Sequence, residues 1–379
     1  MDFELSETEL MVQRTAFQFA TKELAPRAAE ADDDPDFARR SAELLARHGY
    51  LGIMIPEEYD GQGMTGFDYV IAKEQMARAC LSTGATLGAH NLAVYCIMLM
   101  GTPEQKERFL PLLAGGERIG AFALTEANTG SDVAAIVAGA TRDNSHYRIN
   151  GSKQFITNGG IASLVVVFAK TDRSQGHRGI SAFVVDKESS AFGVAKEENK
   201  MGIRGTSTGQ LVFDDCRVPV ENRLGAEGDG FKLAMMVLDR ARPSVGAQAL
   251  GVAQAALDAA MRYARERVVF GEPIADFQAI RFAFADMATR LDAARLLVYR
   301  AAKLASAGKG RFSKESAMAK LYASETAHWV VDRALQIHGG YGYMKEYPIE
   351  RLYRDQRILE IYEGTSEIQR LIISGHLLK

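Results

Sequence analysis

The sequence predicts an α+β multidomain protein in which an N-terminal helical domain precedes an antiparallel β domain and a C-terminal helical bundle. Apolar residues recur at helical spacing from about residue 5 to residue 116. Short β-branched runs replace that pattern between about 119 and 225, and helical spacing returns after 230. A chain of 379 residues also exceeds what one hydrophobic core usually supports. We therefore expect domains at residues 1–118, 119–226 and 227–379.

The N-terminal block contains a clear helix start at Thr102-Pro103-Glu104-Gln105, where Thr102 caps the helix and Gln105 completes a capping box. Residues 80–103 just before it contain no Asp, Glu, Lys or Arg, and they are long enough to cross a bilayer. Their hydroxyl, histidine and amide side chains would be costly in lipid. We therefore expect a buried helix there and no membrane span.

The middle block contains β-branched runs at residues 164–168, 180–185 and 210–213. Asn150-Gly151 lies between two further short strand-like segments, and this dipeptide is the strongest local signal for a tight hairpin turn. We therefore expect a small antiparallel sheet with a turn at Asn150-Gly151.

The C-terminal block has the longest apolar stripe, which predicts a helix packed in a bundle with helices of similar length. Its members are Phe277, Ile280, Phe284, Met287, Leu291, Ala294, Val298 and Ala301. A second helix is expected at 316–338, ending where Gly339 can adopt a positive φ. The last helix is expected at 366–378, with Ser366 and Gln369 as a capping box.

Composition excludes several classes of function. Lys and Arg total 45 against 48 for Asp and Glu, so there is no net basic charge to hold nucleic acid. The three cysteines are far apart and the seven histidines lack ligand spacing, so we expect free buried thiols and no metal. The acidic start resembles neither a signal nor a transit peptide, and we expect a cytoplasmic (bacterial) protein or a mature organellar matrix form.

The segment 61–66 matches the letters of a dinucleotide fingerprint, G-x-G-x-x-G. No buried strand precedes it, and its flanks are helical, so a loop between helices is the better interpretation. No P-loop and no G-x-S-x-G elbow occur in the chain.

Four segments carry residue types suited to a planar ligand. The run 121–132 combines apolar residues, hydroxyls and a glycine, although, taken alone, it is better explained as a solvated loop. Phe155-Ile156-Thr157 offers an aromatic face and a hydroxyl, as an isoalloxazine ring requires. Arg267 in the run 266–271 can hold a pyrophosphate with its forked donors, and the glycines of 336–340 permit close backbone approach; a surface charge and a simple helix stop remain as alternatives.

A fifth segment contains Glu363, followed by Gly364 and the start of the last helix. A carboxylate there can be a base or merely a partner of the helix dipole. Taken together, in their order and spacing over essentially the whole chain, the five segments resemble the FAD-dependent acyl-CoA dehydrogenase family, of short-chain, medium-chain or branched-chain type. The run IYEGTSEIQR at 361–370 is the most specific of them, supported by ERVVFG, FITNGG and QIHGG.

The resemblance implies a C-terminal four-helix bundle, FAD between the β domain and the bundle and across a subunit interface, a homotetramer built as a dimer of dimers, and an electron-transferring flavoprotein as partner. It implies cofactor-binding roles for Phe122, Leu124, Thr125, Gly130, Ser131, Phe155, Ile156, Thr157, Arg267, Phe270, Gln278, Gln336, Ile337, Gly339, Gly340, Thr365 and Glu367. It implies that acyl-CoA is bound by Ser131, Asp239, Arg242, Tyr362 and Gly364.

Glu363 is the catalytic base that the resemblance implies. Some relatives take their base from the position of Ala241, and alanine cannot serve. Glu363 would remove the α proton while flavin N5 accepts the β hydride, which yields the trans-2-enoyl-CoA, with the thioester carbonyl held by the Glu363 backbone N–H and a ribityl hydroxyl. The same site run in reverse, as an enoyl-CoA reductase, is the first alternative, and a non-catalytic or nucleic-acid-associated relative is the second.

Two further points follow from the sequence. It departs from the family pattern at Ala127-Asn128-Thr129, where the family usually has a proline followed by small residues. The uncharged stretch is expected to line the acyl tunnel with Leu87, His90, Asn91, Leu92 and Tyr95.

Overall fold

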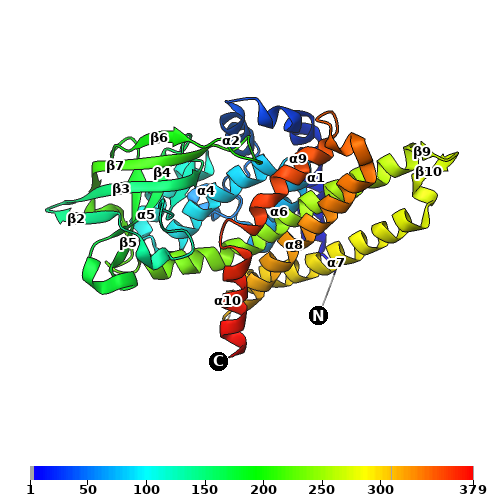
Figure 1. The fold of residues 1–379 in the computed structure, drawn as a ribbon. Helices are drawn as coiled ribbons and strands as arrows, with labels where there is room; N and C mark the ends of the chain where they lie inside the picture. The colour runs from blue at the N-terminus through cyan, green and yellow to red at the C-terminus, as the bar shows by residue number, and fades with distance from the viewer. Residues whose placement is uncertain (1–3, 309, 379) are drawn as a thin grey trace.

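The computed structural model describes residues 4–308 and 310–378. Figure 1 shows the chain as a β domain at one end from which three long helices run to the other, with the N-terminal helices packed alongside. The N-terminal helices are α1 (Glu7–Phe19), α2 (Phe37–Arg47), α3 (Gly66–Ala79), α4 (Leu81–Met100) and α5 (Pro103–Ala114).

Helix α4 is the predicted uncharged helix, and its burial is confirmed. Among the described residues it is the one helix long and apolar enough to cross a membrane, yet 78% of that window is buried inside the protein. It is therefore a core helix. The capping box before α5 is also confirmed, because the Thr102 hydroxyl accepts from the Gln105 N–H at 3.3 Å and the Gln105 side chain accepts from the Thr102 N–H at 2.9 Å. The glycine-rich segment 61–66 is a loop that leads into α3, as predicted.

The β domain forms one sheet in the order β6-β7-β3-β2-β4-β5-β8, with β1 paired to β4. The predicted runs at 164–168, 180–185 and 210–213 fall in β4, β5 and β7. Most neighbours are antiparallel, but β1 and β2 each pair with β4 in parallel. The strands are β1 (Gly120–Ala123), β2 (Gly139–Asp143), β3 (His146–Thr157), β4 (Leu164–Lys170), β5 (Ile180–Asp186), β6 (Gly193–Glu197), β7 (Thr208–Pro219) and β8 (Arg223–Leu224).

The hairpin turn predicted at Asn150-Gly151 is wrong, because β3 runs straight through this dipeptide. Gly151 pairs with Phe213 on β7 at a register shift, and a Cβ on Gly151 would lie 2.8 Å from the Cβ of Ala138. The glycine therefore permits a close approach of two strands rather than a turn. The chain reverses at Asn144 instead, between β2 and β3, where φ is 53°.

The C-terminal bundle consists of α6 (Gly230–Glu266), α7 (Gln278–Ser306), α8 (Ser313–His338), α9 (Pro348–Gln356) and α10 (Ser366–Leu377), with a small hairpin of β9 (Val268–Val269) and β10 (Glu272–Pro273). The predicted stripe is buried from Met287 to Ala301 in α7, and α8 ends before Gly339 at a φ of 59°. The predicted cap of the last helix is wrong by one residue. Thr365, not Ser366, caps α10, and its hydroxyl accepts from the Ile368 N–H at 3.3 Å.

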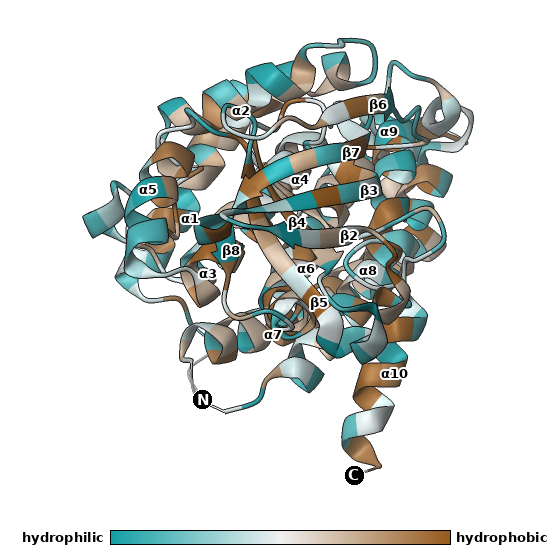
Figure 2. Cartoon of the chain, turned by 90° about the vertical axis from the view of Figure 1, so that its left-hand side faces the viewer, coloured by the Kyte–Doolittle hydropathy of each residue, from teal (hydrophilic) through white to brown (hydrophobic). Residues whose placement is uncertain are grey.

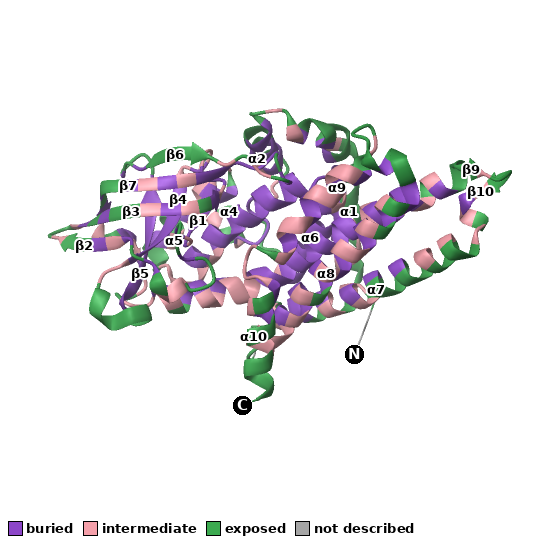
Figure 3. Cartoon of the chain, in the orientation of Figure 1, coloured by how far each residue is buried: buried purple, intermediate pink, exposed green. Residues whose placement is uncertain are grey.

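Burial is unequal among these helices. Figure 3 shows α6 largely buried, while α10 and the outer face of α7 are exposed. Figure 2 shows apolar segments on the projecting α10, where Leu371 and Leu377 are 66% and 69% exposed. Apolar side chains that project in this way are typical of a surface that another chain covers.

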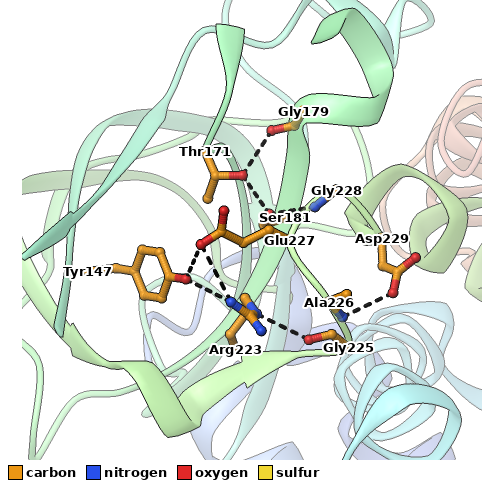
Figure 4. A network of polar contacts seen from close by, with 10 residues as sticks. All are labelled: Tyr147, Thr171, Gly179, Ser181, Arg223, Gly225, Ala226, Glu227, Gly228 and Asp229. Carbon is orange, nitrogen blue, oxygen red and sulfur yellow. Dashed lines mark hydrogen bonds and ion pairs between the residues drawn. The ribbon is translucent and has the colours of Figure 1, made fainter. Parts of the chain in front are cut away.

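A polar network fixes the β domain to the start of α6 (Figure 4). The Arg223 guanidinium donates to the Tyr147 hydroxyl at 2.8 Å and to the Gly225 carbonyl at 3.1 Å. The Ser181 hydroxyl accepts from the Gly228 N–H at 3.0 Å. Gly228 has a φ of 88°, and a Cβ there would meet the Arg178 carbonyl at 2.4 Å. The sheet and the long helix are thus held in one relative position, and the candidate site lies between them.

Candidate active site

A cavity of about 400 Å³ lies where the β domain, α3, α4, α6 and the turn before α10 meet. The structure brings twelve of the predicted site residues into its wall. They are Phe122, Leu124, Thr125, Gly130, Ser131, Phe155, Ile156, Thr157, Arg242, Tyr362, Glu363 and Gly364.

Glu363 reaches the cavity because the chain reverses sharply at this residue. Its φ is 52° and that of Gly364 is 99°, both in the left-handed half of backbone space. The Gly364 carbonyl accepts from Lys320 Nζ at 2.8 Å and from Gln369 Nε2 at 2.9 Å. A Cβ on Gly364 would lie 2.6 Å from that same Gln369 nitrogen, so only glycine fits. The turn is held from two sides and directs the carboxylate inward.

Glu363 is half-buried, and its Oε2 is shielded from solvent and has no hydrogen-bond partner among the described residues. Burial raises the pKa of Glu363 above its usual value, while Lys73, Lys320 and Arg242 act in the opposite direction. No N–H of α10 donates to it, so the alternative of a helix-dipole partner is not what the structure shows. A desolvated, unpaired carboxylate beside a cavity has the properties of a general base.

Arg242 and Asp239 lie one turn apart on α6, where an i,i+3 spacing brings their side chains together. Arg242 is only 3% exposed and lines the cavity, and its Nε has no partner among the described residues. Asp239 pairs with Arg242 and with the Ser313 hydroxyl outside the cavity wall. Asp239 therefore fixes the guanidinium, which is free to contact a ligand.

The opposite wall comes from the ends of β1 and β3. A register shift in β3 between Lys153 and Ile156 turns the next residues toward the cavity. Phe155 has a φ of 58° and stays 61% exposed, although it is a large apolar side chain. An aromatic ring held in a strained conformation with an open face indicates a binding surface for another apolar group.

A buried ion pair anchors this wall. Lys153 Nζ lies 2.8 Å from Glu126 Oε1 and donates to the Leu124 carbonyl at 3.0 Å. The other Glu126 contacts are the backbone N–H groups of Val137 and Ala138, at 2.7 and 3.0 Å. The segment that departs from the family pattern, 127–129, forms a tight turn closed by two backbone hydrogen bonds of 3.1 Å between Glu126 and Thr129. Sequence reasoning missed this pair, because its members are 27 residues apart.

The cavity wall fits a flavin. Phe155 offers an aromatic face against which a planar ring can lie, and Thr157 offers a hydroxyl at the edge of that ring. Gly130 leaves open space, because no atom lies within 4 Å of the place where its Cβ would be. Glu363 lines the same cavity from the other side. The residues of the wall can therefore bind an apolar ring and place a reacting group beside it.

The other predicted cofactor residues lie elsewhere in the chain. Arg267, Ile337, Gly339 and Gly340 line a second cavity of about 450 Å³ near the β9–β10 hairpin, at the opposite end of the molecule from the sheet (Figure 1). The remaining five, Phe270, Gln278, Gln336, Thr365 and Glu367, line neither cavity. The two sets do not meet within one chain.

The expected acyl-tunnel residues are corrected by the structure, because only Leu92 of the five lines the cavity. The other four do not line it, and His90 accepts from the Gly120 N–H at 3.1 Å in the core. The face of α4 turned to the cavity carries Ala85, Gly88, Ala89 and Leu92. Lys73 of α3 and Gln248 of α6 also line it and were missed, because α3 is buried on all sides and shows no amphipathic period.

A carboxylate opposite an aromatic wall suits proton removal from a carbon acid beside a planar redox cofactor, so the fold and the cavity are those of an oxidoreductase with such a cofactor. Comparison with protein families gives the particular family. The models of the N-terminal, middle and C-terminal domains of acyl-CoA dehydrogenase match residues 6–117, 121–216 and 228–378. The chain belongs to the acyl-CoA dehydrogenase family, and the predicted family, fold class and cofactor are confirmed.

Individual relatives are similar over their full length. The acryloyl-CoA reductase (NADH) of Anaerotignum propionicum is 49% identical, covering 100% of this chain and 96% of that protein. The butyryl-CoA dehydrogenase structure from Megasphaera elsdenii is 44% identical with a TM-score of 0.96, covering 100% of each chain. A structure described as the electron transferring flavoprotein of Acidaminococcus fermentans contains a chain 46% identical with a TM-score of 0.98, again covering 100% of each.

Proposed function

We propose that this protein dehydrogenates a short acyl-CoA thioester between its α and β carbons and that Glu363 is the base. The observation that carries the proposal is Glu363, whose Oε2 is buried and unpaired among the described residues and whose side chain lines a cavity large enough for an acyl chain. The similarity to a butyryl-CoA dehydrogenase supports a short chain.

The residues of the chain divide the chemistry between them. Burial strengthens Glu363 as a base, and the three nearby cations favour the ionised form that accepts the α proton. The backbone N–H of Glu363 holds the thioester carbonyl and stabilises the charge that develops there. Phe155, Ile156 and Thr157 form the wall for the cofactor, and FAD bound against it supplies the acceptor for the β hydride. Arg242 and the apolar wall around Glu363 exclude water.

A specific observation favours the reverse direction as a second candidate, because the relative with 49% identity is named an acryloyl-CoA reductase. The same residues serve both directions, and the redox partner decides between them. We propose an electron-transferring flavoprotein as that partner, since a structure of such a flavoprotein contains a chain 46% identical to this one.

We also propose a homotetramer, built as a dimer of dimers, in the bacterial cytoplasm or an organellar matrix. The second cavity supports this assembly, since Arg267 and the glycines that line it lie too far from the first cavity to act on the same FAD within one chain. The exposed apolar side chains of α10 and of the β9–β10 hairpin supply surface for subunit contacts. In that assembly Arg267, Phe270, Gln278 and Gln336 to Gly340 bind the FAD of a neighbouring subunit.

Glu363→Gln tests the proposed base. The purified wild type should be yellow and lose its visible flavin absorbance when butyryl-CoA is added without oxygen. The variant should keep its FAD, since the amide has the same shape, and should bleach at least about a thousandfold more slowly, because it cannot accept a proton. Equal bleaching rates in the two proteins would remove Glu363 from its proposed role.

A further inference from the structure

Lys73 is a buried charge that the mechanism does not use. It lies on α3 with its side chain fully buried, and it lines the floor of the cavity. Its one hydrogen bond among the described residues is to the Ser244 hydroxyl at 3.1 Å, and that hydroxyl donates its own proton to the Ala241 carbonyl at 2.8 Å. An ammonium has three N–H donors. Lys73 therefore lies in the cavity wall with most of its donor capacity unpaired among the described residues.

Two nitrogen donors lie close together at this part of the cavity wall. A Cβ on Gly88 would lie 2.5 Å from Lys73 Nζ and 3.9 Å from Gln248 Nε2, so the missing side chain at Gly88 makes room for the ammonium, and both donors lie beside this glycine. The Gln248 oxygen accepts from the Tyr362 hydroxyl at 2.6 Å, which leaves its NH₂ group as the part that faces Lys73. The floor of the cavity therefore presents donors.

The three cations around Glu363 differ in the partners that they have. Arg242 pairs with Asp239, and Lys320 donates to the Gly364 carbonyl. Lys73 has no carboxylate within ion-pair distance among the described residues, although it is as deeply buried as the other two. Burial lowers its pKa to about 8, and Glu363 is the charge that acts in the opposite direction. A buried cation without a paired anion is costly, so an anion from a ligand would stabilise it.

We propose that Lys73, with Gln248, binds a carboxylate at the far end of the acyl chain, and that the preferred substrates are CoA thioesters of short dicarboxylic acids. The inference rests on the proposed function, because it requires the acyl chain to lie in this cavity beside Glu363. The cavity walls near the floor are small side chains, Ala85 and Ala89, which leave room for a planar carboxylate. The floor would then select the end of the chain while Glu363 acts at its start.

Binding to the FAD-loaded Glu363→Gln protein tests the inference without turnover. Succinyl-, glutaryl- and adipyl-CoA are titrated against butyryl-, valeryl- and hexanoyl-CoA, which match them in carbon number, and the change in the flavin spectrum gives each Kd. We expect at least one carboxylate-ended thioester to bind more tightly than its methyl-ended match. Adding Lys73→Met should weaken the binding of that thioester about ten- to hundredfold, which corresponds to the loss of one charged hydrogen bond. The Kd values of the methyl-ended series should stay the same or fall.

Two further variants keep the test decisive. Gly88→Ala places a methyl group against Lys73 Nζ and should selectively weaken the binding of the carboxylate-ended thioester. This variant tests the inference even if Lys73→Met fails to fold. Lys320→Met is the matched control, since it removes a buried cation that lies near residue 363 but does not line the cavity. It should leave the ratio of the Kd values of the two series unchanged.

Two results would overturn the inference, namely tighter binding of the methyl-ended thioester at every length, or equal weakening of both series by Lys73→Met. The second result would mean that Lys73 supports the cavity for any acyl chain and does not recognise a carboxylate. The proposed function is tested separately by flavin bleaching of the wild type with both series. If methyl-ended thioesters alone bleach it, dehydrogenation stands and the carboxylate site fails, whereas bleaching by neither series removes the proposed function itself.

Discussion

The ion pair between Lys153 and Glu126 allows a prediction whose size follows from its burial. The two side chains are 0% and 6% exposed, and their charged atoms lie 2.8 Å apart. Glu126→Gln removes one charge and leaves the Lys153 ammonium buried beside neutral groups. Breaking a buried pair in this way costs about 3–5 kcal/mol, which in a chain of this size lowers Tm by roughly 4–6 °C. We expect a loss in that range.

The double variant Glu126→Gln/Lys153→Met is the matched control. It removes both charges, so no unpaired ion remains, and it should recover most of the lost Tm. Thermal unfolding followed by circular dichroism, on FAD-loaded and FAD-free protein, measures all four members of the cycle. Since Lys153 also holds the Leu124 carbonyl at the cavity wall, the single variants should lose FAD more readily. Additive effects of the two substitutions would refute the reasoning.

The pH dependence of the same pair has a definite sign. Burial opposes ionisation of Glu126, but the Lys153 charge and its hydrogen bonds outweigh burial and hold the pKa of Glu126 below its usual value of 4.5. The contribution of the Glu126 charge to stability is therefore present above pH 4.5 and is lost as the pH falls through the lower pKa that Glu126 has in the folded protein. The Tm difference between wild type and Glu126→Gln should narrow in that acidic range. A difference that stays constant down to acid unfolding would contradict the assignment.

Two further predictions concern the Glu363 turn. Lys320→Met removes a cation that lowers the pKa of Glu363, so the acidic limb of kcat/KM should move to higher pH, while Lys320→Arg should move it less. An unchanged limb would exclude Lys320 from tuning the base. Gly364→Ala strains a residue with a φ of 99° and places a methyl group 2.6 Å from the Gln369 side chain. We therefore expect kcat/KM to fall roughly tenfold or more, while the circular dichroism spectrum stays unchanged. Gly375→Ala, on the exposed part of α10, is the control and should leave kcat/KM unchanged.

Local signals in the sequence were sufficient where the physics is local. The capping box at Thr102, the end of α8 at Gly339 and the apolar stripe of α7 each depend on neighbouring residues of one helix, and each was predicted. Asn150-Gly151 failed for the opposite reason. A glycine signals conformational freedom, but whether that freedom serves a turn or a close strand contact depends on Ala138, which lies on another segment.

The candidate site shows the same division. Glu363 was predicted because its flanking run is a continuous pattern, and the structure adds what makes it a base, namely burial, an unpaired oxygen and three cations from α3, α6 and α8. Lys73 had no signal of its own, because a helix buried on every side offers no polar face from which a functional lysine would stand out.

The sequence by itself thus determined the family, the order of helical and β regions, the cofactor class and the position of the carboxylate, since all of these depend on residue types at short spacing. Only the tertiary structure decided which face of α4 meets the cavity, which cations surround Glu363, and that the two groups of predicted cofactor residues lie at opposite ends of one chain. These depend on how helices far apart in the sequence rotate and pack against one another, and side-chain packing sets that rotation.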